Sequence, residues 1–576
     1  MHLDSLAPEL ILQVAEHLSR RHWQRLRLTC KVLSETLAAL VVNKISINAD
    51  RENVTDLFDS IMGRSVLIPP IYAIKALDIT SLCETVIPPS DSDDKSHPYY
   101  DPKRPERDEA FMKELLPVLL RLTHVQKIQW VIHSDKAESS LDQVGKIVSS
   151  YPLLESLKIV VFDYGSIPSL RLFRNLLDLD YGGYDMLAPT SPIDDLCHVI
   201  AQSPKLRKLS FESKWYRELD NLLQPCSAAG IQLPLDTIVI KSCNSPLSLL
   251  PHVHHLKILD ITSSGNYDRY NASRHPDLER FWLEMLQTDT AITQLGVDHV
   301  PPSLIQYLKS YSGLETFRFI ASHGSPSDVS RNMSSDFYNE ALANHRATLK
   351  KLTIWFDYAE EWCWTPDIQT ALSKCTVLRH VKFGVSRAQI EEGVPPVLNS
   401  EEDNTVETPA ETDPLPLHVI IHRVAKECPS IRTLDLRSTL AELLPDRFES
   451  YTLQNELWDA FEKSLGAYVS EEGVKSLPFI YGGPGGSGYE CLFSPVLDKE
   501  TKKLKYQKRR RSKTNNLRRA LWTNWMLHPD YTGKLKALLP EHDPDDQEPD
   551  CKVVSYEDFH NPEIYTPPYV LSDTED

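Results

Sequence analysis

Glycine is scarce in this chain of 576 residues, which contains 20 glycines and 40 prolines. Average usage is about 7% glycine and about 5% proline, so the usual ratio is inverted. The shortage of glycine disfavours nucleotide-binding folds, which depend on clustered glycines. The many prolines favour short elements separated by turns.

Paired cysteines, a signal sequence and long apolar runs are also missing. The 10 cysteines show no paired spacing, which indicates reduced thiols in a reducing compartment. The first residues include Asp4 and Glu9 and lack a basic start followed by an apolar run. No run reaches the roughly 18 apolar residues that a membrane helix needs. We therefore expect a cytoplasmic or nuclear protein with no part in a membrane.

Patterns for catalysis or metal binding do not stand out. No arrangement of serine, histidine and acid marks a nucleophile, although such triads are recognised by geometry. His252, His254 and His255 have no cysteine or carboxylate pair to complete a metal site, so we expect partly exposed polar residues. The glycine run from Tyr481 to Tyr489 lacks the lysine and serine of a phosphate-binding loop and predicts a surface loop. We expect no catalytic residue, cofactor or metal; a hydrolase within an α/β fold is the less favoured reading.

Charge is distributed unevenly near the end of the chain. Residues 541–576 hold twelve acidic side chains and one lysine, a charge of −11 out of the net −19. The interval from Lys499 to Arg519 is strongly basic. Such a run is either an import signal or nucleic-acid patch, or a solvated strip that folds back on the acidic tail. The residues that define this basic segment are Lys502, Lys503, Lys508, Arg509, Arg510, Arg511 and Lys513.

Apolar residues at the start of the chain predict a small group of helices. Leu10, Ile11, Val14 and Ala15 recur at helical spacing, and Pro8 suits the first turn. Two further short helices follow before residue 47. Three helices in about forty residues bury too little surface to be stable alone. This segment should therefore rely on a partner or on the rest of the chain.

The same segment resembles the F-box motif. Leu6-Ala-Pro-Glu-Leu10 matches its leucine-proline-x-glutamate-leucine start, with Ala7 in place of the first proline, and Leu26 to Lys31 supplies its later leucine, cysteine and lysine. The resemblance implies that residues 1–47 bind a Skp-type linker protein, and through it a cullin ubiquitin ligase. An N-terminal helical cap on a larger domain is the alternative. The linker-binding residues that the resemblance implies are Leu6, Pro8, Leu10, Ile11, Leu28, Cys30 and Leu33.

A six-residue frame recurs along the body of the chain, with apolar residues at its first, fourth and sixth positions. About 40 such matches are expected by chance in a chain that is 41% hydrophobic, so the frame needs support. The support is that helical patterns precede several frames, for example before Leu154, Leu206 and Ile292, so the period changes from 3.6 to 2. The twelve frames begin at Ile74, Val125, Leu154, Leu176, Leu206, Leu235, Leu256, Ile292, Leu314, Leu349, Leu378 and Ile431.

A repeated helix, turn and short strand resembles the irregular leucine-rich repeats found behind an F-box. The implied fold class is α/β: a short helical F-box followed by a leucine-rich-repeat-like solenoid with parallel strands. An unrelated α/β fold with alternating helices and strands is the alternative. The two longest intervals between frames indicate either an insertion or a missed unit. In Trp362-Cys-Trp364, strand alternation predicts one buried and one exposed tryptophan.

The expected domain organisation follows from these patterns. Residues 1–47 are the F-box-like part, and 48–440 are the solenoid, with mobile loops near 88–107 and 391–416. Residues 441–490 form a C-terminal cap with a helix over 448–468, and 491–576 form the basic segment and a disordered acidic tail. Lys44-Ile-Ser-Ile47 is expected to lead straight into the solenoid.

The functional expectation is a substrate-recognition adaptor of a Skp/cullin/F-box ubiquitin ligase that is not itself an enzyme. The resemblance implies that the solenoid holds an unknown protein target near the ubiquitin-charged enzyme, which raises effective concentration. A nuclear leucine-rich-repeat scaffold that binds nucleic acid or protein independently of ubiquitin is the alternative.

Overall fold

The computed structural model covers the helical start of the chain and a long repetitive body. The residues that it describes are 6–16, 18, 20–27, 29–41, 43–49, 54–63, 71–82, 104–133, 138–162, 168–183, 193–213, 222–241, 245–262, 275–321, 333–356, 362–385, 416–438, 459–471, 474, 477–483, 491–498 and 500–509.

A mostly parallel sheet forms the framework. Across the described residues it has 16 strands, and they follow one another in strict sequence order. Pairing is parallel as far as β14, and the last two pairings are antiparallel. The strands are β1 (Lys44–Asn48), β2 (Ala76–Ser81), β3 (Lys127–His133), β4 (Ser156–Phe162), β5 (Asp178–Gly183), β6 (Lys208–Ser213), β7 (Thr237–Lys241), β8 (Ile258–Thr262), β9 (Gln294–Val297), β10 (Thr316–Ala321), β11 (Lys351–Phe356), β12 (His380–Val385), β13 (Thr433–Ser438), β14 (Phe479–Gly483), β15 (Cys491–Leu497) and β16 (Leu504–Arg509).

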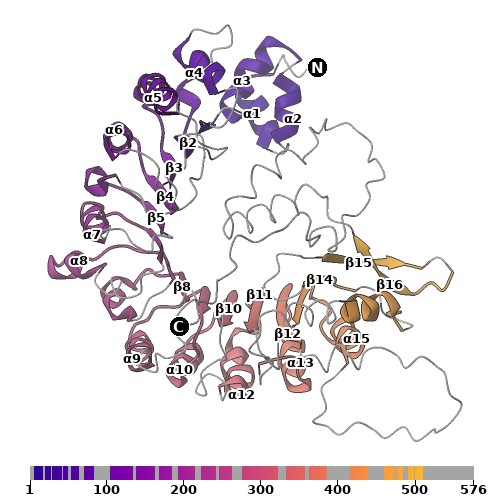
Figure 1. Ribbon diagram of the computed structural model, residues 1–576. Helices are drawn as coiled ribbons and strands as arrows, with labels where there is room; N and C mark the ends of the chain where they lie inside the picture. Colours follow the sequence, from indigo (N-terminus) through magenta and orange to yellow (C-terminus); the bar gives the residue numbers. More distant parts are fainter. Residues whose placement is uncertain are drawn as a thin grey trace, which may run out of the picture. The chain divides into compact units, whose positions relative to one another are not determined.

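Helices and short helical turns connect the parallel strands and lie together on one side of the sheet (Figure 1). The chain is therefore α/β, in an arrangement compatible with a solenoid. Before β1 come α1 (Pro8–Glu16), α2 (Arg20–Arg27) and α3 (Lys31–Val41). The connecting elements are α4 (Val54–Met62), η2 (Ile71–Ala73), α5 (Arg104–Arg121), α6 (Glu138–Ser149), η3 (Leu170–Leu172), α7 (Ile193–Ala201), α8 (Gln224–Ala228), η5 (Pro246–His252), α9 (His275–Leu286), α10 (Pro302–Ser310), α12 (Ser334–Asp336), η7 (Phe337–Ala341), η8 (Leu342–His345), α13 (Pro366–Ser373) and α15 (Leu417–Glu427).

The twelve predicted frames all become strands. Each strand from β2 to β13 begins two residues after the first apolar residue of its frame. In the frame that begins at Leu235, for example, Ile238 and Ile240 of β7 are buried, whereas Lys241 at the end of the strand is partly exposed. The fourth and sixth positions therefore face the helices, because alternate residues of a strand point to opposite faces.

Backbone hydrogen bonds keep the units in register. The carbonyl of Lys75 accepts from the N–H groups of Gln126 at 2.8 Å and Lys127 at 3.0 Å. The carbonyl of Glu155 is used in the same way by the next unit. The residue that precedes each strand thus fixes where the following strand begins. These bonds also keep the backbone groups at the starts of the strands paired.

The two longest intervals between frames contain insertions. β2 pairs directly with β3, and β12 pairs directly with β13, so neither interval supplies another strand between them. The loops predicted near 88–107 and 391–416 lie in these intervals. Apart from 104–107, at the start of α5, and Pro416, which precedes α15, they fall outside the described residues.

Two separate apolar cores support these elements. One runs through the sheet and its helices from Ile45 of β1 to Tyr506 of β16. The other is small and lies within the first three helices. Lys44-Ile-Ser-Ile47 enters the sheet as β1, as expected from the sequence, so the boundary at residue 47 falls inside the first strand.

The sheet continues beyond the predicted end of the solenoid at residue 440. β14 joins β13 in parallel, and β15 and β16 extend the sheet as an antiparallel pair. Residues 459–467 are helical and bury Phe461, within the helix expected over 448–468. The predicted cap therefore contributes a strand, and the segment from 491 to 509 belongs to the sheet.

The expectation for Trp362 and Trp364 is wrong. Both side chains are buried, at 0% and 2% exposure. The residues lie in a turn before α13 and not in a strand, so the alternation rule does not apply. Trp362 packs against Phe319 and Phe337, and Trp364 packs against Phe383.

Candidate partner-binding surfaces

Helix α1 carries apolar side chains on two sides. Ile11 and Ala15 are buried against Leu33 and Leu37 of α3 and form the small core. Leu10 and Val14 have the same four-residue spacing but are 47% and 42% exposed. Because residues four apart lie on one side of a helix, Leu10 and Val14 form a second apolar stripe that faces away from the core. We call this pair the α1 stripe.

The predicted linker-binding residues divide between core and surface. Ile11 and Leu33 are buried in the small core, where they hold α1 on α3. Pro8 and Leu10 are exposed, and Leu6 and Cys30 are half-buried. Leu28 lies outside the described residues. Of this set, Pro8 and Leu10 are the side chains most available to a partner.

Trp23 ties α2 to α1, and backbone bonds define the start of α1. Trp23 of α2 packs on this core, and its indole N–H donates to the carbonyl of Ala15 at 2.7 Å. Backbone N–H groups of Leu10 and Ile11 donate to the carbonyl of Ala7 at 3.0 and 3.1 Å. The residue that replaces the first proline of the family pattern therefore lies at the start of α1 and is exposed.

A second candidate surface is the face of the sheet turned away from the connecting helices, which we call the helix-free face. It carries the side chains between the buried positions of each strand. The parallel register aligns these side chains across neighbouring strands, as for Lys158, Asp180 and Ser210 on β4, β5 and β6. Rows of partly exposed side chains therefore run across the sheet.

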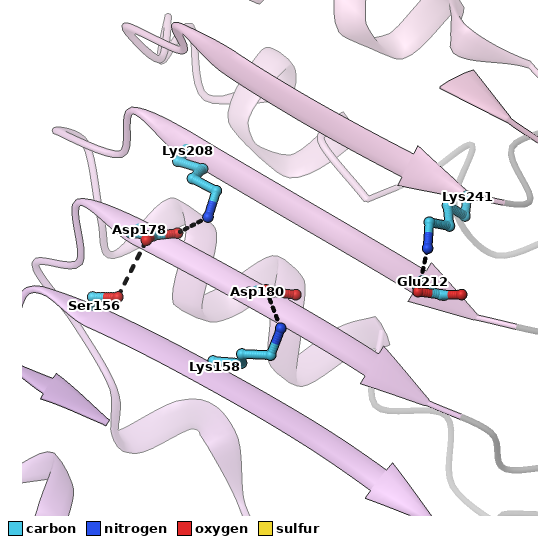
Figure 2. A network of polar contacts seen from close by, with 7 residues as sticks. All are labelled: Ser156, Lys158, Asp178, Asp180, Lys208, Glu212 and Lys241. Atoms are coloured by element: carbon cyan, nitrogen blue, oxygen red, sulfur yellow. Dashed lines mark hydrogen bonds and ion pairs between the residues drawn. The ribbon is translucent and has the colours of Figure 1, made fainter. Parts of the chain in front are cut away.

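Charges are matched on the part of this face formed by β4 to β7 (Figure 2). Three ion pairs link neighbouring strands there. They are Lys158 to Asp180 at 2.8 Å, Lys208 to Asp178 at 3.5 Å and Lys241 to Glu212 at 2.7 Å. Ser156 also donates to Asp178 at 3.2 Å. Each of the three lysines thus has a carboxylate, and we call this region the paired segment.

A glycine permits a further ion pair across an intervening strand. Asp260 of β8 and Arg318 of β10 lie in one register row on either side of Gly296 of β9. The guanidinium of Arg318 reaches the carboxylate of Asp260 at 2.6 Å. A Cβ atom on Gly296 would lie 2.6 Å from Asp260 Oδ1, closer than atoms tolerate. The absence of a side chain here is what allows the two charges to meet.

Around β11 to β13, only some of the cations pair with a described carboxylate. Lys350 pairs with Glu315 at 2.7 Å, and Lys382 pairs with Asp435 at 3.6 Å. Lys351, Arg379 and Arg432 are exposed, and no ion pair joins them to any other described residue. We call these three residues the cationic patch. Burial and then the charges of these three residues lower the pKa of the neighbouring His380.

Sequence reasoning did not select the cationic patch. Arg379 and Arg432 directly follow the first apolar residue of their frames, and Lys351 comes two residues after the first apolar residue of its frame. An alignment of the twelve frames by their apolar positions contains the signal, because it places residues of neighbouring units side by side. The alignment does not show which of these cations are already paired with a carboxylate.

The three histidines differ from the expectation in one case. His252 is 1% exposed, and its Nδ1 accepts from the N–H of Leu233 at 3.1 Å. Burial lowers its pKa, which keeps the ring neutral and able to accept. His254 and His255 are exposed and line an open groove of about 520 Å³ together with Asp236. His252 is therefore a structural acceptor in the core.

The basic segment begins in β16, which pairs with β15 on one side and has a single antiparallel bridge, from Lys505 to Val469, on the other. Lys508 of β16 forms an ion pair with Glu462, and Lys502 and Lys503 lie in the turn before the strand. Arg509 ends β16, and Arg510, Arg511 and Lys513 lie outside the described residues, as does the acidic tail.

Other kinds of site are not seen in the part of the chain that is described. No group of three histidine, cysteine or acidic side chains there is arranged to hold a metal ion. Among the described helices, none is long and apolar enough to cross a membrane. No protein-family model matches the chain, and no curated protein matches it in sequence.

Proposed function

We propose that this protein is a substrate-recognition adaptor of a Skp/cullin/F-box ubiquitin ligase. The observation that carries the proposal is the α1 stripe. Leu10 and Val14 are exposed on a helix whose other apolar side already fills the small core. Exposed apolar residues at helical spacing are typical of a helix that docks on a partner. This stripe lies in the segment that resembles the F-box.

The separation of the two cores supports a docking role for the first three helices. Among the side chains described in α1 to α3, four are buried in the small core, which is little for an independent unit. A partner that covers Leu10 and Val14 would add apolar burial worth about 1.5–3 kcal/mol for each side chain. Docking of a linker protein therefore stabilises the helices as well as connecting them to a cullin.

The body of the chain suits target recognition. Its frames and parallel strands agree with a leucine-rich-repeat-like solenoid, and its rows of partly exposed side chains offer a broad surface for a protein. In this proposal the body holds the target close to the ubiquitin-charged enzyme. Catalysis then comes from the ligase, and this chain contributes effective concentration.

Deletion of residues 1–42 tests the proposal while leaving β1 in the sheet. We expect co-purification with a Skp-type linker protein to be lost and the remaining protein to keep its helical and strand content by circular dichroism. Linker binding that persists after the deletion would contradict the proposal. A repeat scaffold that acts without ubiquitin predicts no linker binding by either form.

A further inference from the structure

The cationic patch on β11 to β13 is formed by neighbouring units. The N–H of Arg379 donates to the carbonyl of Lys350 at 2.9 Å, and the N–H of Arg432 donates to the carbonyl of Arg379 at 2.8 Å. These residues therefore immediately precede consecutive strands, which are spaced about 4.8 Å apart. Lys351 is the register partner of His380, the residue after Arg379. The three cations of the patch thus lie close together where three adjacent strands begin.

The patch retains its charge because nearby carboxylates are already engaged. Glu315 pairs with Lys350 and Asp435 pairs with Lys382. Among the described residues, no carboxylate is left to pair with Lys351, Arg379 or Arg432. Like charges held this close repel one another, so an anion that binds there relieves the repulsion as well as forming new contacts.

We infer that the cationic patch binds a short acidic segment of a protein, bearing carboxylates or phosphorylated side chains. Two guanidinium groups at the starts of neighbouring strands suit such groups because each offers a planar pair of donors. Alternate side chains of an extended peptide are about 7 Å apart. Two or three acidic side chains therefore match a patch that spans about 10 Å across three strands.

The surroundings of the patch favour a short peptide over nucleic acid. Glu315 lies next to the start of β11, and Asp435 lies on β13, three residues after Arg432. Asp178, Asp180 and Glu212 lie further along the same sheet. A continuous phosphate backbone that crosses the patch would extend over these carboxylates. The net charge of −19 also opposes a long polyanion.

The use of this patch to recruit a target rests on the function proposed above, whereas the binding itself does not. The two are tested separately. Peptide binding is measured on the full chain without a linker protein, and linker binding is measured by the deletion of residues 1–42. If one of the two binding measurements is negative, the other can still be interpreted.

The experiment uses labelled peptides of about ten residues, long enough to cross the patch when extended. One alternates glutamate with serine, a second replaces the glutamates by phosphoserine, and a third replaces them by glutamine. Fluorescence anisotropy at low ionic strength should show binding of the first two and not of the third. The stronger of the first two identifies carboxylate or phosphate as the preferred group.

The variant K351A/R379A/R432A removes the patch. The matched control K127A/R207A/K257A removes three exposed cations that are spread over other units of the same sheet. We expect the patch variant to weaken peptide binding about tenfold or more and the control to change it less than about twofold. Each triple variant loses three positive charges and keeps the terminal segments. A general electrostatic effect would therefore weaken peptide binding equally in both.

Three outcomes overturn the inference. The first is an equal loss of peptide binding in the two triple variants, and the second is no binding of either acidic peptide by the unmodified chain. The third is tighter binding of a single-stranded oligonucleotide of equal charge, lost in the patch variant, which would assign the patch to nucleic acid. Circular dichroism and the unfolding midpoint of each variant verify that the fold is retained.

Discussion

The paired segment and the cationic patch share one backbone arrangement and differ in their exposed charges. Both lie on parallel strands joined in the same register. In the paired segment three lysines each have a carboxylate on a neighbouring strand, whereas the three cations of the patch form no ion pair with any described residue. The buried frame positions therefore set the fold, and the exposed positions can vary without disturbing it.

The same contrast applies to the polar groups that hold the units together. Ser203 accepts from the N–H of Leu176 at 3.1 Å beside the paired segment. Near the patch this role belongs to His345, whose Nδ1 accepts from the N–H of Leu314 at 3.3 Å. Serine does not titrate in this range and histidine does. The two regions should therefore respond differently to acid.

Acidification gives the largest expected effect. Burial lowers the pKa of His345 to about 4, and the bond between Nε2 and the Leu308 carbonyl opposes this shift. The unfolded chain, with a pKa near 6.5, then binds more protons than the folded chain between about pH 6.5 and 4. Stability contributed by neutral His345 is complete above pH 6.5 and falls as the pH drops towards 4, by up to about 3 kcal/mol.

Hydrogen exchange at mildly acidic pH measures this difference by region. Amides of β10 and β11 should lose protection between pH 6.5 and 4, while amides of β5 and β6 near Ser203 should change less. The variant His345→Gln removes the titrating ring and should flatten the pH dependence around β10 and β11. Equal loss of protection in both regions would contradict the assignment to His345.

A side chain at Gly296 gives the next largest effect. In G296A the new Cβ collides with the carboxylate of Asp260 and displaces its ion pair with Arg318. We expect a loss of about 1–3 kcal/mol in the free energy of unfolding, measured with denaturant. G182A is the control, because a Cβ there would have its nearest neighbour, the Ile159 carbonyl oxygen, at 4.0 Å. Similar losses in the two variants would show that the gap at Gly296 has no special role.

Removal of cations gives the smallest effect and compares the two regions directly. K158A/K208A/K241A breaks the three ion pairs of the paired segment and should lower stability by about 0.2–1 kcal/mol for each pair. K351A/R379A/R432A removes repulsion and should leave stability unchanged or slightly higher. Denaturant unfolding at low and high salt measures both. A larger loss of stability in the patch variant would show that these cations support the fold.

The positions of the repeat strands could be predicted from the sequence, because their apolar frame reflects a face that must be buried. Twelve frames, from Ile74 to Ile431, each mark a strand. β14, β15 and β16 were missed, since Tyr481-Gly-Gly and the Pro495 within β15 weaken the strand pattern. Pairing with β13 and with one another stabilises these three strands, although their local sequence does not favour strand structure.

The candidate surfaces were only partly predictable. The F-box resemblance named Ile11 and Leu10 together, but one fills the small core and the other is exposed. Both are apolar and adjacent, so the sequence does not separate them without the position of α3. His252 was likewise assigned to the surface, because its acceptor role depends on a neighbour nineteen residues earlier.

The most direct measurement of the central claim is the affinity of the full chain for a purified Skp-type linker protein, with the α1 stripe altered. L10K/V14K places two charges on the exposed stripe and leaves Ile11 and Ala15 in the small core. L172K/L283K, which alters two leucines that are 43% and 44% exposed elsewhere, is the control. We predict that L10K/V14K weakens linker binding by about a hundredfold or more, while the control binds like the unmodified chain. Unchanged binding by L10K/V14K, or equal loss in both variants, would contradict the account.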